Sequence, residues 1–147
     1  MINYQSDVVL NRPVEQVYKL VTDVARYDDW TDMSGTHLVQ GDNLHIGSQV
    51  ETTIKMGPMA QTMVFQVTDL EENRRLGLKT ISKGAMEWDS DFTLESQGPS
   101  STRMTSSGQL RFNGLLKLLE PLMAGEIRSG EAKELVKFKE LLESMKA

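Results

Sequence analysis

The sequence contains no cysteine among its 147 residues, which excludes disulfide bonds, thiolate metal sites and cysteine nucleophiles. Long apolar runs are also missing, because the longest unbroken ones, at 8–10, 63–65 and 122–124, span three residues. A transmembrane helix needs about 20 apolar residues, and a signal-peptide core also needs more than these runs offer. We therefore expect a cytoplasmic protein with no stable membrane insertion.

The chain also lacks an excess of positive charge. Its 16 Lys and Arg residues are outnumbered by 21 Asp and Glu residues, for a net charge of −5. An acidic chain has no overall attraction for phosphate backbones, so no nucleic-acid partner is expected. We find no phosphate-binding or dinucleotide-binding glycine loop and no Gly-x-Ser-x-Gly motif. With two histidines, His37 and His45, on polar segments, we expect neither a cofactor nor a metal site.

The first thirty residues predict one strand and two short helices. Residues 2–10 end in a Val-Val-Leu run that favours a strand, and Pro13 suits the first turn of a helix. The second helix is predicted over 24–30, with Asp23 available as its N-cap. The first helix shows an apolar face at i, i+3, i+4 and i+7, formed by Val14, Val17, Tyr18 and Val21.

Between residues 37 and 112 the apolar period changes to two. In 86–95, for example, Met86, Trp88, Phe92 and Leu94 alternate with polar residues. Short turns between such segments predict antiparallel hairpins with one buried and one solvated face. Glu87, Asp89 and Asp91 then fall together on the solvated face, so we interpret them as surface residues rather than a metal or acid–base site.

The last third of the chain predicts a long amphipathic helix. Pro121 lacks a backbone N–H and is expected to break or kink this helix near 117–120. The predicted buried stripe consists of Leu115, Leu119, Leu122, Met123 and Ile127, and resumes at Leu135, Phe138, Leu141 and Leu142. The one-sided sheet must bury its apolar face, and this helix is the element large enough to cover it.

These elements predict the fold class α+β, as one domain over residues 1–147. A curved antiparallel sheet of about seven strands would wrap around the long C-terminal helix, with two short helices after the first strand.

Several segments carry a resemblance to a known family. Residues 11–18 read Asn-Arg-Pro-Val-Glu-Gln-Val-Tyr, and Thr22-Asp23 and Arg26-Tyr27 lead to Trp30. Together with the hairpin-rich middle and the terminal helix, the sequence resembles the START-like (SRPBCC) superfamily, in particular its polyketide cyclase/dehydrase and lipid-transport group. The resemblance covers nearly the whole chain. It implies a helix-grip fold with a cavity between sheet and C-terminal helix, in which members bind lipids, sterols, quinones or polyketides.

The predicted inner faces mix large apolar residues with small and hydroxyl-bearing ones. A buried hydroxyl without a partner costs about 1–3 kcal/mol, and Gly108 in a strand interior leaves side-chain volume empty. A bound ligand would resolve both, and this is the interpretation we favour. The alternative is that these residues lie near strand ends, or that Gly108 allows a close approach of the helix. We predict a lipophilic pocket lined by Trp30, Ile54, Met63, Phe65, Leu78, Thr80, Met86, Trp88, Ser90, Phe92, Met104, Ser106, Gly108, Leu119, Met123, Glu126 and Ile127.

The flexible side chains among the nine methionines suit a permissive pocket, and fill an irregular core equally well. Glu126, on the predicted apolar stripe, is the candidate acid or base, because burial would raise its pKa.

Three functions remain open at this point. The first is a carrier or sensor of a small lipophilic ligand. The second is an aromatase/cyclase-like or dehydratase-like enzyme that would use Ser106, Thr80 and Glu126. The third is a protein-interaction module like those of chaperone-activating relatives.

Overall fold

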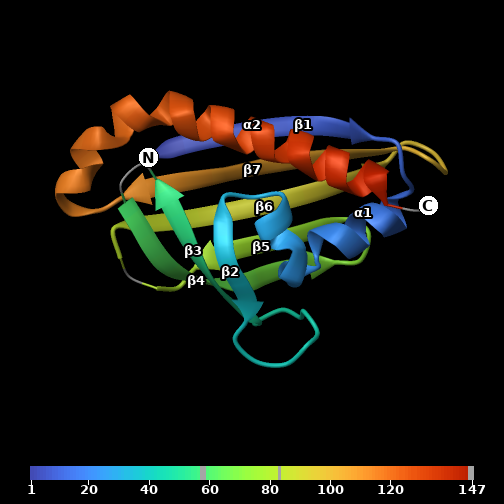
Figure 1. Cartoon of the computed structure of the whole chain (residues 1–147), viewed down its shortest axis with the longest axis horizontal. Coiled ribbons are helices and arrows are strands. Elements are labelled where there is room, and N and C mark those ends of the chain that lie inside the picture. The colour runs from blue at the N-terminus through green and yellow to red at the C-terminus, as the bar shows by residue number, and fades with distance from the viewer. Residues whose placement is uncertain (57–58, 83, 146–147) are drawn as a thin grey trace.

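The computed structural model describes residues 1–56, 59–82 and 84–145. Within these residues, seven antiparallel strands form one sheet in the order β1-β7-β6-β5-β4-β3-β2 (Figure 1). The strands are β1 Ile2–Leu10, β2 Met33–Leu38, β3 Gln49–Met56, β4 Met59–Glu71, β5 Arg75–Thr80, β6 Met86–Ser96 and β7 Thr102–Phe112. The predicted fold class and the helix-grip arrangement are confirmed.

The period-two pattern places one face of each strand in the core. On β6, Met86, Trp88, Phe92 and Leu94 are buried, as their alternation predicts. The opposite face of β6 lies toward solvent. There Arg111 donates to the Glu87 carboxylate, and Arg75 donates to both carboxylate oxygens of Asp91. The acidic row of Glu87, Asp89 and Asp91 is therefore a surface feature, and Glu87 and Asp91 form ion pairs with neighbouring strands.

Two short helices follow β1, as predicted. The helix α1 spans Val14–Val21 and buries its apolar face, and η1, a 3-10 helix, spans Val24–Asp29. Asp23 directly precedes η1, but its side chain makes no capping hydrogen bond. That detail of the prediction was wrong, because Asp23 is exposed and it is the backbone carbonyl, not the carboxylate, that accepts from the Arg26 N–H.

The C-terminal region consists of a 3-10 helix η2, Gly114–Leu119, and the long helix α2, Glu120–Ser144. Pro121 lies in the first turn of α2, where a missing N–H has no intrahelical partner to lose. The predicted break is thus a boundary between two helices. Figure 1 shows α2 running alongside β1 and β7 over the concave face of the sheet.

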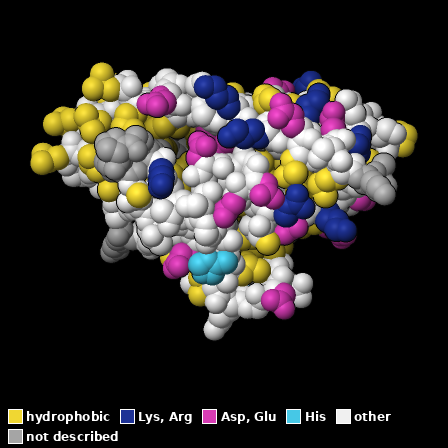
Figure 2. All heavy atoms as spheres, viewed as in Figure 1, with side chains coloured by type: hydrophobic (Ala, Val, Ile, Leu, Met, Phe, Trp, Pro, Cys, Tyr) yellow, Lys and Arg dark blue, Asp and Glu magenta, His cyan; other side chains and the backbone are white. Residues whose placement is uncertain are grey.

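The predicted buried stripe is wrong at its beginning. Leu115 is 87% exposed and Leu122 is 80% exposed, and Leu119 is also exposed. The reason is positional, since η2 and the first turn of α2 lie at the end of the sheet, where these three side chains are left in solvent. Figure 2 shows hydrophobic side chains gathered on the surface at this end. The stripe is buried from Ile127 onward, through Leu135, Phe138 and Leu142.

Candidate functional site

A cavity of about 140 Å³ opens between α2 and the strands β2 and β3. A smaller, more enclosed cavity of about 30 Å³ lies directly beside it, since four lining residues are common to both. These four are Met33, Trp88, Glu131 and Glu134. Figure 2 shows Asp and Glu side chains on this face, below α2 and toward β2.

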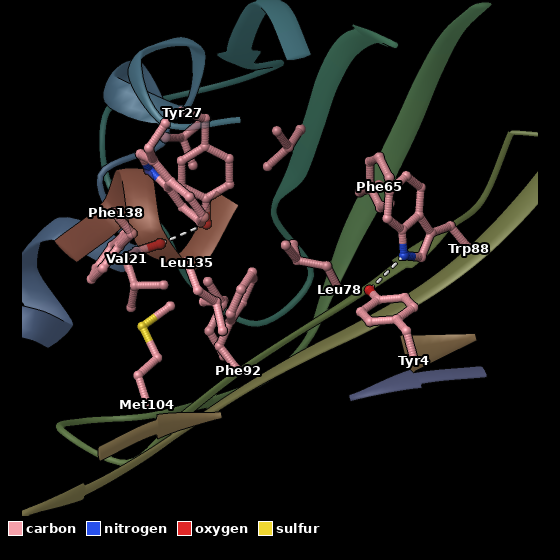
Figure 3. Packing of buried hydrophobic residues seen from close by; sticks show 14 of the residues in the cluster. Tyr4, Val21, Tyr27, Phe65, Leu78, Trp88, Phe92, Met104, Leu135 and Phe138 are labelled. Carbon is pink, nitrogen blue, oxygen red and sulfur yellow. Dashed lines mark hydrogen bonds between the residues drawn. The ribbon is translucent and has the colours of Figure 1, made fainter. Parts of the chain in front are cut away.

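The inner wall of the cavities is aromatic. Trp88 of β6 lines both, and Phe65 of β4 packs edge-on against it with ring centroids 6.2 Å apart (Figure 3). Trp30, which follows η1, meets Phe92 of β6 and Phe138 of α2 at 5.9 and 4.9 Å. Edge-to-face contacts of this kind fix the orientation of each ring, so the wall is preformed.

Gly108 does not leave empty volume, which corrects the prediction made from sequence. A Cβ at this position would lie 2.7 Å from Tyr4 Cζ, and closer still to the Tyr4 hydroxyl and the Asp89 carbonyl oxygen. The space is filled by the ring of Tyr4. Gly108 lies between Tyr4 and Ser90 in the register of β1, β7 and β6, so its missing side chain lets the Tyr4 ring cross β7.

Two carboxylates of α2 enter the cavity region. Glu131 is 7% exposed, and Glu134, one turn further along, is half-buried. Burial raises the pKa of Glu131 to about 7, and the charge of Asp32 adds to this effect. Burial and the neighbouring charge of Glu131 also raise the pKa of Glu134 well above its ordinary value. The pair therefore retains a proton at pH values where a surface glutamate has none.

The partners of this pair are few. The backbone N–H of Asp32 donates to Glu134 Oε1 at 3.3 Å. Among the described residues, no Lys, Arg or His side chain lies within ion-pair distance of Glu131 or Glu134; Lys137 instead approaches Asp32 at 4.0 Å. Lys55 lines the mouth of the larger cavity as an exposed side chain.

Comparison with known families gives a match over almost the whole chain. The model for the polyketide cyclase / dehydrase and lipid transport family matches residues 1–143. The chain belongs to this family. The comparison with curated proteins gave no match.

Solved structures similar to this family member share its fold at low sequence identity. A START superfamily protein from Mycobacterium smegmatis is 17% identical with a TM-score of 0.77, over 99% of this chain and 100% of that chain. A Zhui aromatase/cyclase from Streptomyces sp. R1128 is 11% identical with a TM-score of 0.78, over 96% and 93%. Norcoclaurine synthase from Thalictrum flavum, in complex with dopamine and hydroxybenzaldehyde, is 13% identical with a TM-score of 0.70, over 99% and 88%.

Ten of the pocket residues predicted for this family member line the two cavities. The larger cavity has Ile54, Trp88, Met123, Glu126 and Ile127 in its lining, and the smaller has Trp30, Phe65, Leu78, Trp88, Ser90 and Phe92. The elements η1, β3, β4, β5, β6 and α2 thus converge on one region.

The other predicted pocket residues lie elsewhere. Met63, Met86 and Met104 are fully buried in the core and line neither cavity. Thr80 Oγ1 accepts the backbone N–H of Trp88, so its hydroxyl has a partner. Ser106 Oγ is buried without a partner in the described part of the chain, but Ser106, Gly108 and Leu119 line neither cavity.

Glu126 lies at the rim of the larger cavity as an exposed residue, so the premise of a buried Glu126 was wrong. The first turns of α2 lie toward the end of the sheet and leave it in solvent. The buried carboxylate that lines the cavities is Glu131, which sequence reasoning missed together with Glu134, Asp32 and Met33. A signal for Glu131 was present, because it lies four residues after Ile127 and four before Leu135 on the buried stripe.

A larger depression of about 560 Å³ lies outside the sheet–helix interior, between α1, η1 and the segment that follows β2. Polar residues of exposed segments, including Asp23, His37, Asp42 and Asn43, form much of its lining. The aromatic wall and buried carboxylates of this family member favour the cavities under α2 as the functional site. No helix in the described part of the chain is both long and apolar enough to span a membrane.

Proposed function

We propose that this protein binds a small lipophilic molecule in the cavity between the sheet and α2, as a carrier or sensor. The observation that carries the proposal is the cavity of about 140 Å³ walled by Trp88, Ile54, Met33 and Met123. Membership of a family that includes lipid transport supports it. Apolar lining with a few polar groups is the usual composition of small-molecule sites.

The expected driving force is burial of apolar surface. A ligand that buries ~300 Å² of apolar area gains ~7 kcal/mol before the cost of association is subtracted. Flexible Met33 and Met123 side chains adapt to ligands of different shape. Micromolar affinity is therefore reachable without a charged anchor.

Two glycines of α2 provide a matched test. Gly130 lines the larger cavity, whereas Gly125 is exposed and lines neither, and a Cβ at either position would meet no atom within 4 Å. Gly130→Leu should fill the cavity and abolish binding, while Gly125→Leu should leave it intact. Both tryptophans of the chain, Trp30 and Trp88, line the cavities, so their fluorescence reports occupancy directly.

The experiment combines native mass spectrometry of gently purified protein with fluorescence titration against a lipid and polyketide panel. Binding that is lost in Gly130→Leu and kept in Gly125→Leu supports the proposal. If no ligand copurifies and no member of the panel binds, the proposal fails.

Glu131 favours a second candidate, an enzyme of the aromatase/cyclase or dehydratase type. A carboxylic acid with its pKa near neutrality can donate and accept a proton at physiological pH. The cavity would hold a flexible polyketone chain in a reactive conformation. Turnover of a model polyketone that disappears in Glu131→Gln and persists in Glu126→Gln would support this candidate. Absence of turnover across model polyketones would count against it.

A further inference from the structure

Two glutamates of α2, Glu131 and Glu134, form a site whose charge no basic side chain of the described residues balances by an ion pair. Glu131 is 7% exposed, and its partner Glu134 receives one hydrogen bond from outside the pair, from the Asp32 backbone N–H. Glu131 and Glu134 each line the larger and the smaller cavity. In a low-dielectric setting, two adjacent carboxylates repel each other strongly unless a proton or a cation lies between them.

A residue with an unpartnered donor lines the same enclosed cavity. Trp30 is 1% exposed, its ring lines the smaller cavity, and its indole N–H has no hydrogen-bond partner in the described structure. A buried donor without a partner is destabilising, because it loses the hydrogen bond that it makes with water in the unfolded chain. An unpaired indole donor and a carboxylate pair that accepts one hydrogen bond from outside it thus line one apolar space. This combination suits a ligand with a polar group and an apolar body.

From this placement we propose that the ligand is a lipophilic amine, whose ammonium group is held by Glu131 and Glu134 while its apolar body contacts Trp88. The inference rests on the proposed ligand-binding function and specifies the chemical class of the ligand.

Other charged groups around the pair agree with a cationic ligand. Asp32 and Glu126 line the same cavity and add negative charge, and the one basic residue of its lining, Lys55, is exposed and forms no ion pair with Glu131 or Glu134 in the described structure. Burial raises the pKa of the Tyr4 hydroxyl, and the charges of Glu131 and Glu134 raise it further. The Tyr4 hydroxyl therefore stays neutral. A carboxylate ligand would add a further negative charge at this site, so fatty acids and other anions are disfavoured.

A metal ion fits the site less well than an organic cation. No group of three or more His, Cys, Asp or Glu side chains in the described residues could hold a metal ion. Two carboxylates beside an apolar, aromatic wall suit an ammonium group, which donates hydrogen bonds to both and leaves its hydrocarbon chain against Trp88.

Three probes with the same phenyl group and similar length test the proposal: phenylbutylamine, phenylbutanol and phenylbutyrate. Their affinities are measured by tryptophan fluorescence at about pH 8, where the amine is charged. We expect the amine to bind about ten-fold more tightly than the alcohol, and the acid most weakly. In Glu131→Gln/Glu134→Gln the amine should fall to the affinity of the alcohol. The control Glu95→Gln/Glu140→Gln removes two exposed carboxylates and should keep the preference.

The outcomes separate the two proposals. If the alcohol binds but the amine binds no more tightly, or if the glutamate double variant keeps the preference, the amine proposal is overturned and lipophilic binding stands. If none of the probes binds to the wild-type protein and the lipid and polyketide panel also fails, the proposed function falls, and the amine proposal falls with it. Gln is nearly isosteric with Glu, and thermal unfolding of each variant confirms that it is folded.

Discussion

Trp88 donates its indole N–H to the hydroxyl oxygen of Tyr4 at 2.8 Å, although the two residues stand on strands separated by β7 (Figure 3). The contact is possible because Gly108, on β7 between them, has no side chain. A buried hydrogen bond of Trp88, which lines both cavities, therefore depends on one glycine. Burial raises the pKa of Tyr4, so its hydroxyl stays protonated.

We expect Gly108→Ala to be strongly destabilising. Its Cβ would overlap the Tyr4 ring and the Asp89 carbonyl oxygen, and the latter belongs to the backbone and moves only with β6. Overpacking of this kind costs about 1–3 kcal/mol of unfolding free energy. Gly125→Ala, on an exposed turn of α2 with free space around its Cβ, should instead stabilise by about 0.5–1 kcal/mol. Urea denaturation measures both, and equal effects would contradict the packing described.

Tyr4→Phe removes the acceptor of the Trp88 indole N–H and leaves this donor buried and unpaired. The expected loss of unfolding free energy is about 1–3 kcal/mol. Tyr18→Phe is the control, because Tyr18 is half-buried and its hydroxyl makes no hydrogen bond in the described structure. Chemical denaturation that shows the same stability for both variants would refute a structural role for the Tyr4 hydroxyl.

The glutamate pair should make stability decrease with rising pH. Because the folded-state pKa of Glu131 is raised from 4.5 to about 7, the folded protein binds more protons than the unfolded chain in this range. The stabilisation is present in full below about pH 4.5 and is lost as the pH rises through 7, by about 3 kcal/mol for such a shift. Glu131→Gln/Glu134→Gln should flatten this dependence. Urea denaturation between about pH 5 and pH 8 is the measurement, and an unchanged slope in the variant would disprove the assignment.

The ion pair between Arg75 and Asp91 should contribute little to stability and nothing to ligand binding. It lies on the solvated face of the sheet, with donor–acceptor distances of 3.0 and 2.9 Å. We expect Asp91→Asn to cost less than about 1 kcal/mol, with the cost reduced by salt. The fluorescence titration that tests the cavity should be unaffected. A loss of ligand affinity in Asp91→Asn would contradict this expectation and indicate that the acidic row is a functional site.

Two leucines of α2 should differ sharply in their contribution to stability. Leu135 is 2% exposed and packs in the core, whereas Leu122 is 80% exposed. We expect Leu135→Ala to lower the free energy of unfolding by about 2–5 kcal/mol. Leu122→Ala should stay within about 0.5 kcal/mol of wild type. Comparable losses in the two variants would mean that Leu122 is covered in solution.

The local order of strands and helices, and the face that each strand buries, could be predicted from the sequence. These features depend on residues that are close together in the sequence. The alternation of Met86, Trp88, Phe92 and Leu94 with polar residues, for example, is complete within a single strand. The helix boundary at Pro121 was predictable for the same reason, since a missing N–H acts within its own turn.

What lies opposite each face was decided by the tertiary structure alone. Periodicity could not tell that Leu122 lies at the end of the sheet while Ile127 lies over it, and so it pointed to Glu126 rather than Glu131 as the buried carboxylate. It also could not show that the ring of Tyr4 fills the space above Gly108. Exposure and cavity volume depend on distances between elements far apart in the chain, and these are set by how the helix, strands and side chains pack together.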